Sequence, residues 1–118
     1  MAGFLGRNVK IFDTEDKFGS ETDLLITDME KASALADCLV DSDVALMRGH
    51  GATIYGRTLP EAVYRAIYAE LNAQILLNSA AVGTFKALSV GECKATVERI
   101  SPQIGRAWDL WVREVERD

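Results

Sequence analysis

The stretch VALMRGHGATIYGRTLPEA, residues 44–62, decides how the middle of this chain folds. Two short apolar runs, 44–47 and 52–56, flank RGHG, whose two glycines permit the backbone angles of a sharp reversal. The pattern predicts two strands joined by a tight turn. It places His50, the single histidine of the chain, at a strand end, where it is the first candidate for a functional group.

A long helix is predicted directly after this stretch. Thr58 is a good N-cap two residues before Pro60, and Gly83 ends the apolar pattern. Large apolar residues recur at every fourth position of the run, and small alanines flank them. These residues are Val63, Ile67, Leu71 and Ile75. The pattern predicts a helix with a wide face for close packing.

Further elements are predicted on both sides of this region. Residues 9–12 have the composition of a strand, and residues 13–23 are typical of a solvated loop. Asp28 caps a predicted helix that runs to about Val40. SVGE at 89–92 has the spacing of a capping box, and a last helix follows Ser101 and Pro102. The apolar side of that last helix holds Ile104, Trp108, Trp111 and Val115. We expect one α/β domain over residues 1–118, with helices at its C-terminal end.

Composition excludes several classes of partner. The 118 residues carry a net charge of -5, with acidic and basic side chains interspersed, so no basic face is available for nucleic acid or an anionic membrane. No run approaches the ~20 apolar residues of a membrane span, and the start is too weakly apolar for a signal peptide. Cys38 and Cys93 lack metal-binding spacing, which indicates reduced, buried thiols in a cytoplasmic protein.

The glycines around His50 first suggest a phosphate-binding loop, which their spacing argues against. Gly56 follows Gly51 by five residues, and the intervening ATIY is typical of a strand where a phosphate loop needs a helix N-terminus. Nucleophilic catalysis with His50 as the base for a serine or for Cys38 is also weakly supported, because no nucleophile motif is present.

Metal ligation and a purely structural role for His50 both remain open from the residues alone. A neutral imidazole flanked by glycines is a suitable ligand, because the glycines leave the approach to the ring clear. A catalytic zinc ion, however, needs three protein ligands, and this chain supplies one histidine. The alternative is an imidazole that is hydrogen-bonded within the turn.

The block ALMRGHGATIYGRTLPEAVYRAIYAELNAQI, residues 45–75, resembles the class II aldolase/adducin family. That family has a strand that ends in a histidine-glycine pair, a second strand closed by glycine, a T-L-x-E-A helix start and a long helix with a glutamate and alanines. AGFLG, VKIFD and FG upstream, and RAWDLW at 106–111, are similar to the decarboxylase-like branch that acts on pyridine or aromatic hydroxy-acids. The likeness covers nearly the whole chain and is most specific in GHGATIYGRTLPEA.

The resemblance implies a fold and an assembly. The family forms a three-layer α/β/α sandwich with a mostly antiparallel sheet, usually as a tetramer with sites at subunit interfaces. Its upstream His-x-His pair and nearby glutamate have no counterpart in this sequence. We therefore expect residues 1–118 to be the C-terminal half of such a domain, and to supply only part of the sandwich.

The resemblance also implies a site. The family histidine that matches His50 is the last of three zinc or manganese ligands, so we expect this chain alone to bind a divalent metal weakly or not at all. Arg48 is expected to attract a small anionic hydroxy-carbonyl or hydroxy-acid substrate, although an arginine at a strand end is more often simply solvated.

The implied activity is that of a metal-dependent carbon-carbon lyase. Aldol cleavage and decarboxylation share an enolate intermediate that a metal stabilises. Tyr55, Tyr64 and Tyr68 are proton donors in principle, but no motif separates them from packing residues. Glu70, between apolar neighbours, is expected to anchor a buried hydrogen bond. The catalytic residues stay unassigned.

Two alternatives to catalysis are left open. Adducin-like relatives keep the fold as a non-catalytic interaction module, since a fold does not imply a function. An inactive truncated fragment would show the same sequence pattern.

Overall fold

The computed structural model describes residues 9–117 of the chain. Within them, one compact unit covers residues 9–55 and another covers residues 56–117. Each unit is described by itself below, and the candidate site lies in the first.

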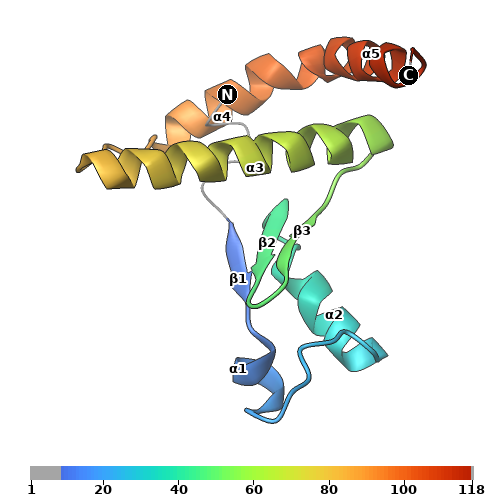
Figure 1. The fold of residues 1–118 in the computed structure, drawn as a ribbon, viewed down its shortest axis with the longest axis vertical. Helices are drawn as coiled ribbons and strands as arrows, with labels where there is room; N and C mark the ends of the chain where they lie inside the picture. The colour runs from blue at the N-terminus through green and yellow to red at the C-terminus, as the bar shows by residue number, and fades with distance from the viewer. Residues whose placement is uncertain (1–8, 118) are drawn as a thin grey trace. The chain divides into compact units, whose positions relative to one another are not determined.

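The first unit contains one small sheet and two helices (Figure 1). In chain order its elements are β1 (Lys10–Phe12), α1 (Thr14–Phe18), α2 (Met29–Cys38), β2 (Val44–Met47) and β3 (Gly51–Ile54). The strand order is β1-β2-β3, with β1 parallel to β2 and β2 antiparallel to β3. The predicted pair of strands around His50 is confirmed, and the mixed sheet comes from the parallel addition of β1.

The core of this unit includes residues of both β1 and β2. Phe12 is 1% exposed, and Val44 and Ala45 are also buried. Buried Ser42 satisfies its own hydroxyl locally, because Oγ donates to the Val44 carbonyl at 2.7 Å and accepts from the Val44 N–H at 3.2 Å. The start of β2 is therefore fixed by both apolar burial and a satisfied polar group.

The sequence predicts a loop over residues 13–23, but the structure has the short helix α1 within this range. The Asp13 side chain accepts from the backbone N–H of Glu15 at 2.9 Å and caps this single turn and a half of helix. Gly19 ends it with a φ of 90°, a backbone angle that favours glycine. Five residues are too few to show an apolar period, so the pattern could not reveal the helix.

The second unit is helical. Its elements are α3 (Leu59–Val82), α4 (Val90–Ile100), a 3-10 turn η1 (Ser101–Gln103) and α5 (Ile104–Val115). The predicted Thr58 cap is confirmed, since its hydroxyl accepts from the Glu61 N–H at 3.3 Å. Both halves of the predicted capping box of α4 are also present.

Helices α3 and α5 pack through aromatic rings. Tyr64 is 1% exposed, and its ring centroid lies 4.5 Å from that of Tyr68 and 5.8 Å from that of Trp111. The later turns of α3 are uncovered: Leu71, Ile75 and Val82 are 43%, 56% and 92% exposed. The face predicted for close packing is therefore covered near its start and open toward its end.

The α/β class predicted from the sequence is confirmed. The three-layer sandwich, the mostly antiparallel sheet and the single domain over residues 1–118 stay predictions. Among residues 9–117, no helix combines the length and the apolar character that crossing a membrane requires.

Candidate functional site

His50 lies at the end of the tight turn that joins β2 to β3. Its backbone N–H donates to the Met47 carbonyl at 3.0 Å and closes the turn. Gly49 has a φ of 81° and Gly51 a φ of 142°, angles that side chains rarely adopt. The two glycines are therefore needed for this reversal, as the sequence predicts, and they leave the His50 ring exposed.

The His50 imidazole is hydrogen-bonded across the unit to residue 24. Its Nε2 lies 2.9 Å from the Leu24 carbonyl oxygen. A carbonyl oxygen can only accept, so Nε2 is the donor and carries the hydrogen in this arrangement. The structural role that the sequence left open, a hydrogen-bonded imidazole at the turn, is thus present, although at an exposed position.

The Leu24 carbonyl is held in place by an unusual backbone. Leu24 has a φ of 66°, the single positive φ among the described non-glycine residues. Its N–H donates to the Thr22 hydroxyl at 3.1 Å, and the next N–H, of Leu25, donates to Asp23 at 3.1 Å. Two consecutive side-chain turns thus fix the peptide that faces His50.

The turn and this segment also touch through Gly49. A Cβ added at Gly49 would lie 3.0 Å from Cδ1 of Leu24, closer than side chains normally approach. The absence of a side chain at Gly49 therefore lets the Leu24 segment reach the imidazole.

Arg48 is bound by two carboxylates of the first unit. Its Nε donates to Asp13 at 2.5 Å and its Nη2 donates to Glu15 at 2.8 Å. The hydrogen bond from Arg48 lowers the pKa of the Asp13 carboxyl, and the same contact raises the pKa of Arg48. Because two negative groups face the guanidinium, little of its charge is left to attract an anion. The substrate-binding role of Arg48 stays a prediction.

Strand register explains this pairing. Phe12 of β1 pairs with Met47 of β2, so the residues that follow them, Asp13 and Arg48, become neighbours. Sequence reasoning missed Asp13, Glu15 and Leu24. The capping spacing at Asp13 was the one available signal for it, and nothing in the sequence connects residue 24 with residue 50.

The described residues do not by themselves complete a metal centre. Among residues 9–117, no group of three histidine, cysteine, aspartate or glutamate side chains is placed to hold a metal ion. His50 has the right chemistry for one ligand and is exposed, but no second ligand accompanies it here. The residues from 9 to 117 therefore do not by themselves fit a complete zinc or manganese site.

The tyrosines predicted as possible proton donors are divided between the two units. Tyr64 packs within the second unit, where burial raises the pKa of its hydroxyl to about 12. A hydrogen bond with Tyr68 acts in the same direction. Tyr55 follows β3 and is half exposed.

The expectation that Glu70 is buried is wrong. The sequence predicts that it anchors a buried hydrogen bond, but Glu70 is exposed and accepts a bond from Gln74 one turn along α3 at 3.3 Å. Its apolar neighbours line the uncovered part of the helix rather than a core. Both cysteines are free thiols as expected, with Cys93 buried and Cys38 half-buried.

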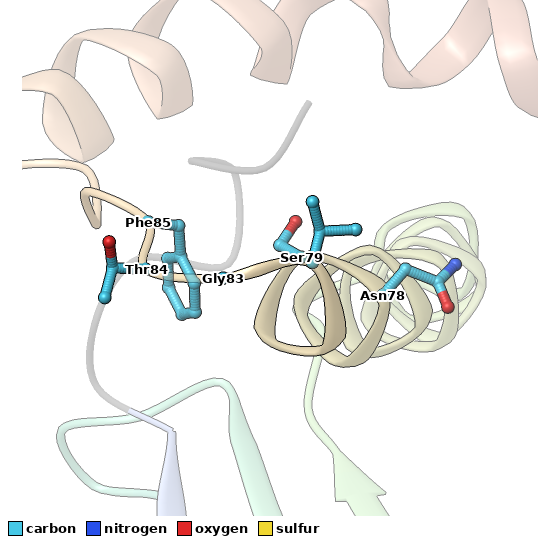
Figure 2. Close-up of a pocket in the computed structure, with 6 residues that line it drawn as sticks. Asn78, Ser79, Gly83, Thr84 and Phe85 are labelled. Atoms are coloured by element: carbon cyan, nitrogen blue, oxygen red, sulfur yellow. The ribbon is translucent and has the colours of Figure 1, made fainter.

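Two hollows lie on the surface of the second unit. One, of about 420 Å³, lies at the end of α3, where Figure 2 shows Ser79 and Phe85 with Asn78, Gly83 and Thr84. It has no ionisable side chain. The other, of about 460 Å³, lies along α3 and α5 and is lined by Tyr64, Tyr68, Gln103, Arg106, Ala107, Asp109, Leu110 and Arg113. Both hollows are open to solvent.

Residues 1–77 match the family model described as the Class II Aldolase and Adducin N-terminal domain. The chain belongs to this family. A curated relative of this chain is "Decarboxylase tropJ" from Talaromyces stipitatus, which is 39% identical over 137 aligned positions. The alignment covers 98% of this chain and 52% of the relative, so the chain spans about half the length of the relative.

The alignment also differs in length from the chain. Its 137 positions exceed the 118 residues of this chain. The relative therefore has residues within the aligned stretch that this chain lacks. The GHGATIYGRTLPEA block forms the turn at His50, β3 and the start of α3.

Proposed function

We propose that this chain supplies one metal-binding histidine, His50, to a divalent-metal carbon-carbon lyase, and that the lyase reaction is decarboxylation. The observation that carries the proposal is the exposed imidazole at the tip of a glycine-flanked turn in a member of the class II aldolase and adducin family. The name of the 39% identical relative, a decarboxylase, supports decarboxylation over aldol cleavage.

The proposed substrate is a small anionic hydroxy-carbonyl compound or hydroxy-acid. In decarboxylation, the bond to the carboxyl carbon breaks, carbon dioxide leaves, and the electron pair stays on the substrate until a proton arrives. A divalent cation, zinc or manganese, would supply Lewis-acid stabilisation of that negative charge. The remaining ligands, absent from the described residues as a group, would come from outside those residues.

The chain's own residues have simpler parts in this proposal. His50 provides a ring nitrogen, and the exposed turn keeps the ring accessible. Asp13 and Glu15 hold Arg48 beside it in the sequence. In this proposal the main role of Arg48 is to orient the turn. Arg48 contacts the substrate only if its ion pair with Asp13 or with Glu15 breaks.

Assembly and location complete the proposal. We propose a homo-oligomer, supported by the uncovered apolar residues of α3, with the chain's sheet forming part of a larger three-layer sandwich. Cytoplasmic location stays a prediction.

Calorimetric titration with zinc and with manganese tests the proposal. We expect weak binding by the chain and none by His50→Ala, because a site with one protein ligand must fill its shell with water. Arg57→Ala, which leaves the imidazole untouched, is the control. Equal binding by the chain and by His50→Ala would show that His50 is not a ligand. Release of carbon dioxide from aromatic hydroxy-acids by a protein of the relative's full length, and its loss in the same His50 variant, tests the reaction.

A non-catalytic interaction module is the second candidate. The open end of α3 favours it, because such a surface is typical of an interface. A full-length protein that self-associates but binds neither metal would support this alternative.

A further inference from the structure

The hollow along α3 and α5 lies wholly within the second unit, and none of its lining residues belongs to the turn at His50. The two helices lie against each other (Figure 1) and leave a space of about 460 Å³ that is open to solvent. A space of this size is sufficient for a small ligand. Which ligand it accepts depends on the charge and the apolar surface of its lining.

Two arginines of α5 line this hollow without a carboxylate partner. Arg106 and Arg113 are seven residues apart, so they lie two helical turns apart on the same side of α5, with Leu110 between them. Both are exposed, and within residues 9–117 no carboxylate forms an ion pair with either guanidinium. Arg48 and Arg65, by contrast, are paired with carboxylates. The positive charges of α5 are therefore available to an anion.

The lining also includes aromatic rings that carry no charge. Tyr64 is 1% exposed, and its ring centroid lies 4.5 Å from that of Tyr68 and 5.8 Å from that of Trp111, so packing fixes this ring. Burial raises the pKa of the Tyr64 hydroxyl to about 12, so it adds no negative charge at neutral pH. Half-buried Tyr68 and exposed Leu110 supply apolar surface for the ring of a ligand.

We propose that this hollow binds a small aromatic carboxylate, with the acidic group between Arg106 and Arg113 and the ring against Tyr68 and Leu110. Guanidinium N–H groups form strong charge-assisted hydrogen bonds to a carboxylate, and aromatic rings pack favourably on one another. An arginine one turn before Leu110 and another one turn after it can both reach a group above that residue. The proposal does not rest on the proposed lyase function, because it uses only residues of the second unit.

Asp109 makes the sign of the electrostatic effect testable. It lines the same hollow, three residues after Arg106 and four before Arg113, and it forms an ion pair with neither of them. Its negative charge opposes that of a bound carboxylate. Removal of this charge should therefore strengthen binding, whereas removal of either arginine should weaken it.

The experiment is a titration of the nitrogen-15-labelled whole chain with 2-naphthoate, at neutral pH and low salt, followed by NMR. We expect saturable shifts of the amide signals of residues 64–68 and 103–113, which border the hollow. Neutral 2-naphthylmethanol lacks the acidic group and cyclohexanecarboxylate lacks the aromatic ring, so each should bind more weakly. The absence of a saturable shift, or equal binding of the three compounds, would overturn the proposal.

Variants locate the bound anion. Arg106→Gln and Arg113→Gln should each raise the Kd about two- to five-fold, the effect of one exposed ion pair. Asp109→Asn should lower the Kd. Arg99→Gln is the matched control, because it removes the same charge from an exposed position of α4 outside the hollow.

The amide spectrum of each variant without ligand shows whether the variant is folded. An equal loss of affinity in Arg99→Gln would mean that only the overall charge attracts the anion, and it would overturn the site. Weaker binding by Asp109→Asn would also contradict the placement of the carboxylate between the two arginines.

Discussion

At the residue scale, the contact of Asp13 with Arg48 contributes to the response of the first unit to acid. The Arg48 hydrogen bond lowers the pKa of Asp13 in the folded chain below the ordinary value of 3.8. A carboxyl with a depressed folded pKa contributes stability above the unfolded pKa and loses it as the pH falls through the folded value.

We therefore expect Asp13→Asn to reduce the free energy of unfolding at neutral pH and to leave it nearly unchanged well below pH 3.8. Asparagine keeps the N-cap of α1, so the substitution removes the charge and little else. Urea unfolding across the acid range measures the effect, with Glu21→Gln in the exposed loop as the control. A parallel loss at all pH values would mean that the charge pair is unimportant.

His50 and Gly49 should differ sharply in what they contribute to stability. His50 is exposed, so His50→Ala should cost less than about 1 kcal/mol. Gly49→Ala places a side chain at a φ of 81° and 3.0 Å from Leu24 Cδ1, and should cost about 1–2 kcal/mol or more. Thermal or urea unfolding of the two variants beside the parent compares them. The reverse ranking would make the imidazole a structural residue first.

At this scale, the sequence could predict the features whose residues lie close together in the chain. His50, Gly49 and Gly51 lie within three positions, and the turn they form was expected. Leu24 and Asp13 reach the site from distant segments, through a positive φ and a strand register. Neither quantity has a signature in a single sequence.

At the element scale, the start of α3 is determined by interactions between residues that are close in the chain. Thr58 accepts from the Glu61 N–H, and the Glu61 carboxylate accepts from the Arg57 N–H at 2.7 Å and pairs with Arg65 at 3.0 Å. All of these partners lie within one or two helical turns, so the start of α3 could be predicted from spacing. Helix α1 lacks such length, and its residue Glu15 has a distant partner, Arg48, at 2.8 Å.

Gly56 offers a test of the packing at this helix start. A Cβ at Gly56 would lie 2.4 Å from the backbone nitrogen of Ala62, and a helix backbone cannot yield as a flexible side chain does. We expect Gly56→Ala to destabilise the chain by about 1–3 kcal/mol.

Gly105→Ala is the matched control for this substitution. Nothing lies within 4 Å of a Cβ at Gly105, which is in α5. Alanine there should stabilise by roughly 0.5–1 kcal/mol, because glycine is a poor helix former. Opposite signs for the same chemical change, measured by urea unfolding, are the expected result. Two losses of equal size would contradict the close approach at Gly56.

At the scale of the whole molecule, the sequence specified the elements better than their arrangement. The α/β class follows from local patterns, but the parallel pairing of β1 with β2 joins segments on either side of α1 and α2. Apolar periodicity does not report which distant strand is the partner.

The uncovered stripe of α3 predicts self-association. Leu71, Ile75 and Val82 lie on one side of the helix and are 43%, 56% and 92% exposed. We expect light scattering to show a mass that rises with concentration, and Ile75→Lys to lower that mass. Gln74→Lys adds the same charge beside the stripe and should have little effect. A monomer at all concentrations would leave this surface without a partner.

The mixed sheet also sets an order of events in time. Strands β2 and β3 are separated only by residues 48–50, and a hairpin of this kind closes within about 1–10 μs. β1 must wait until the long connection through α1 and α2 is closed, and that closure costs more chain entropy. Pulse-labelled hydrogen exchange during refolding should therefore protect the amides of residues 44–54 first and those of residues 10–12 later, so that the turn bearing His50 exists before Leu24 arrives beside it.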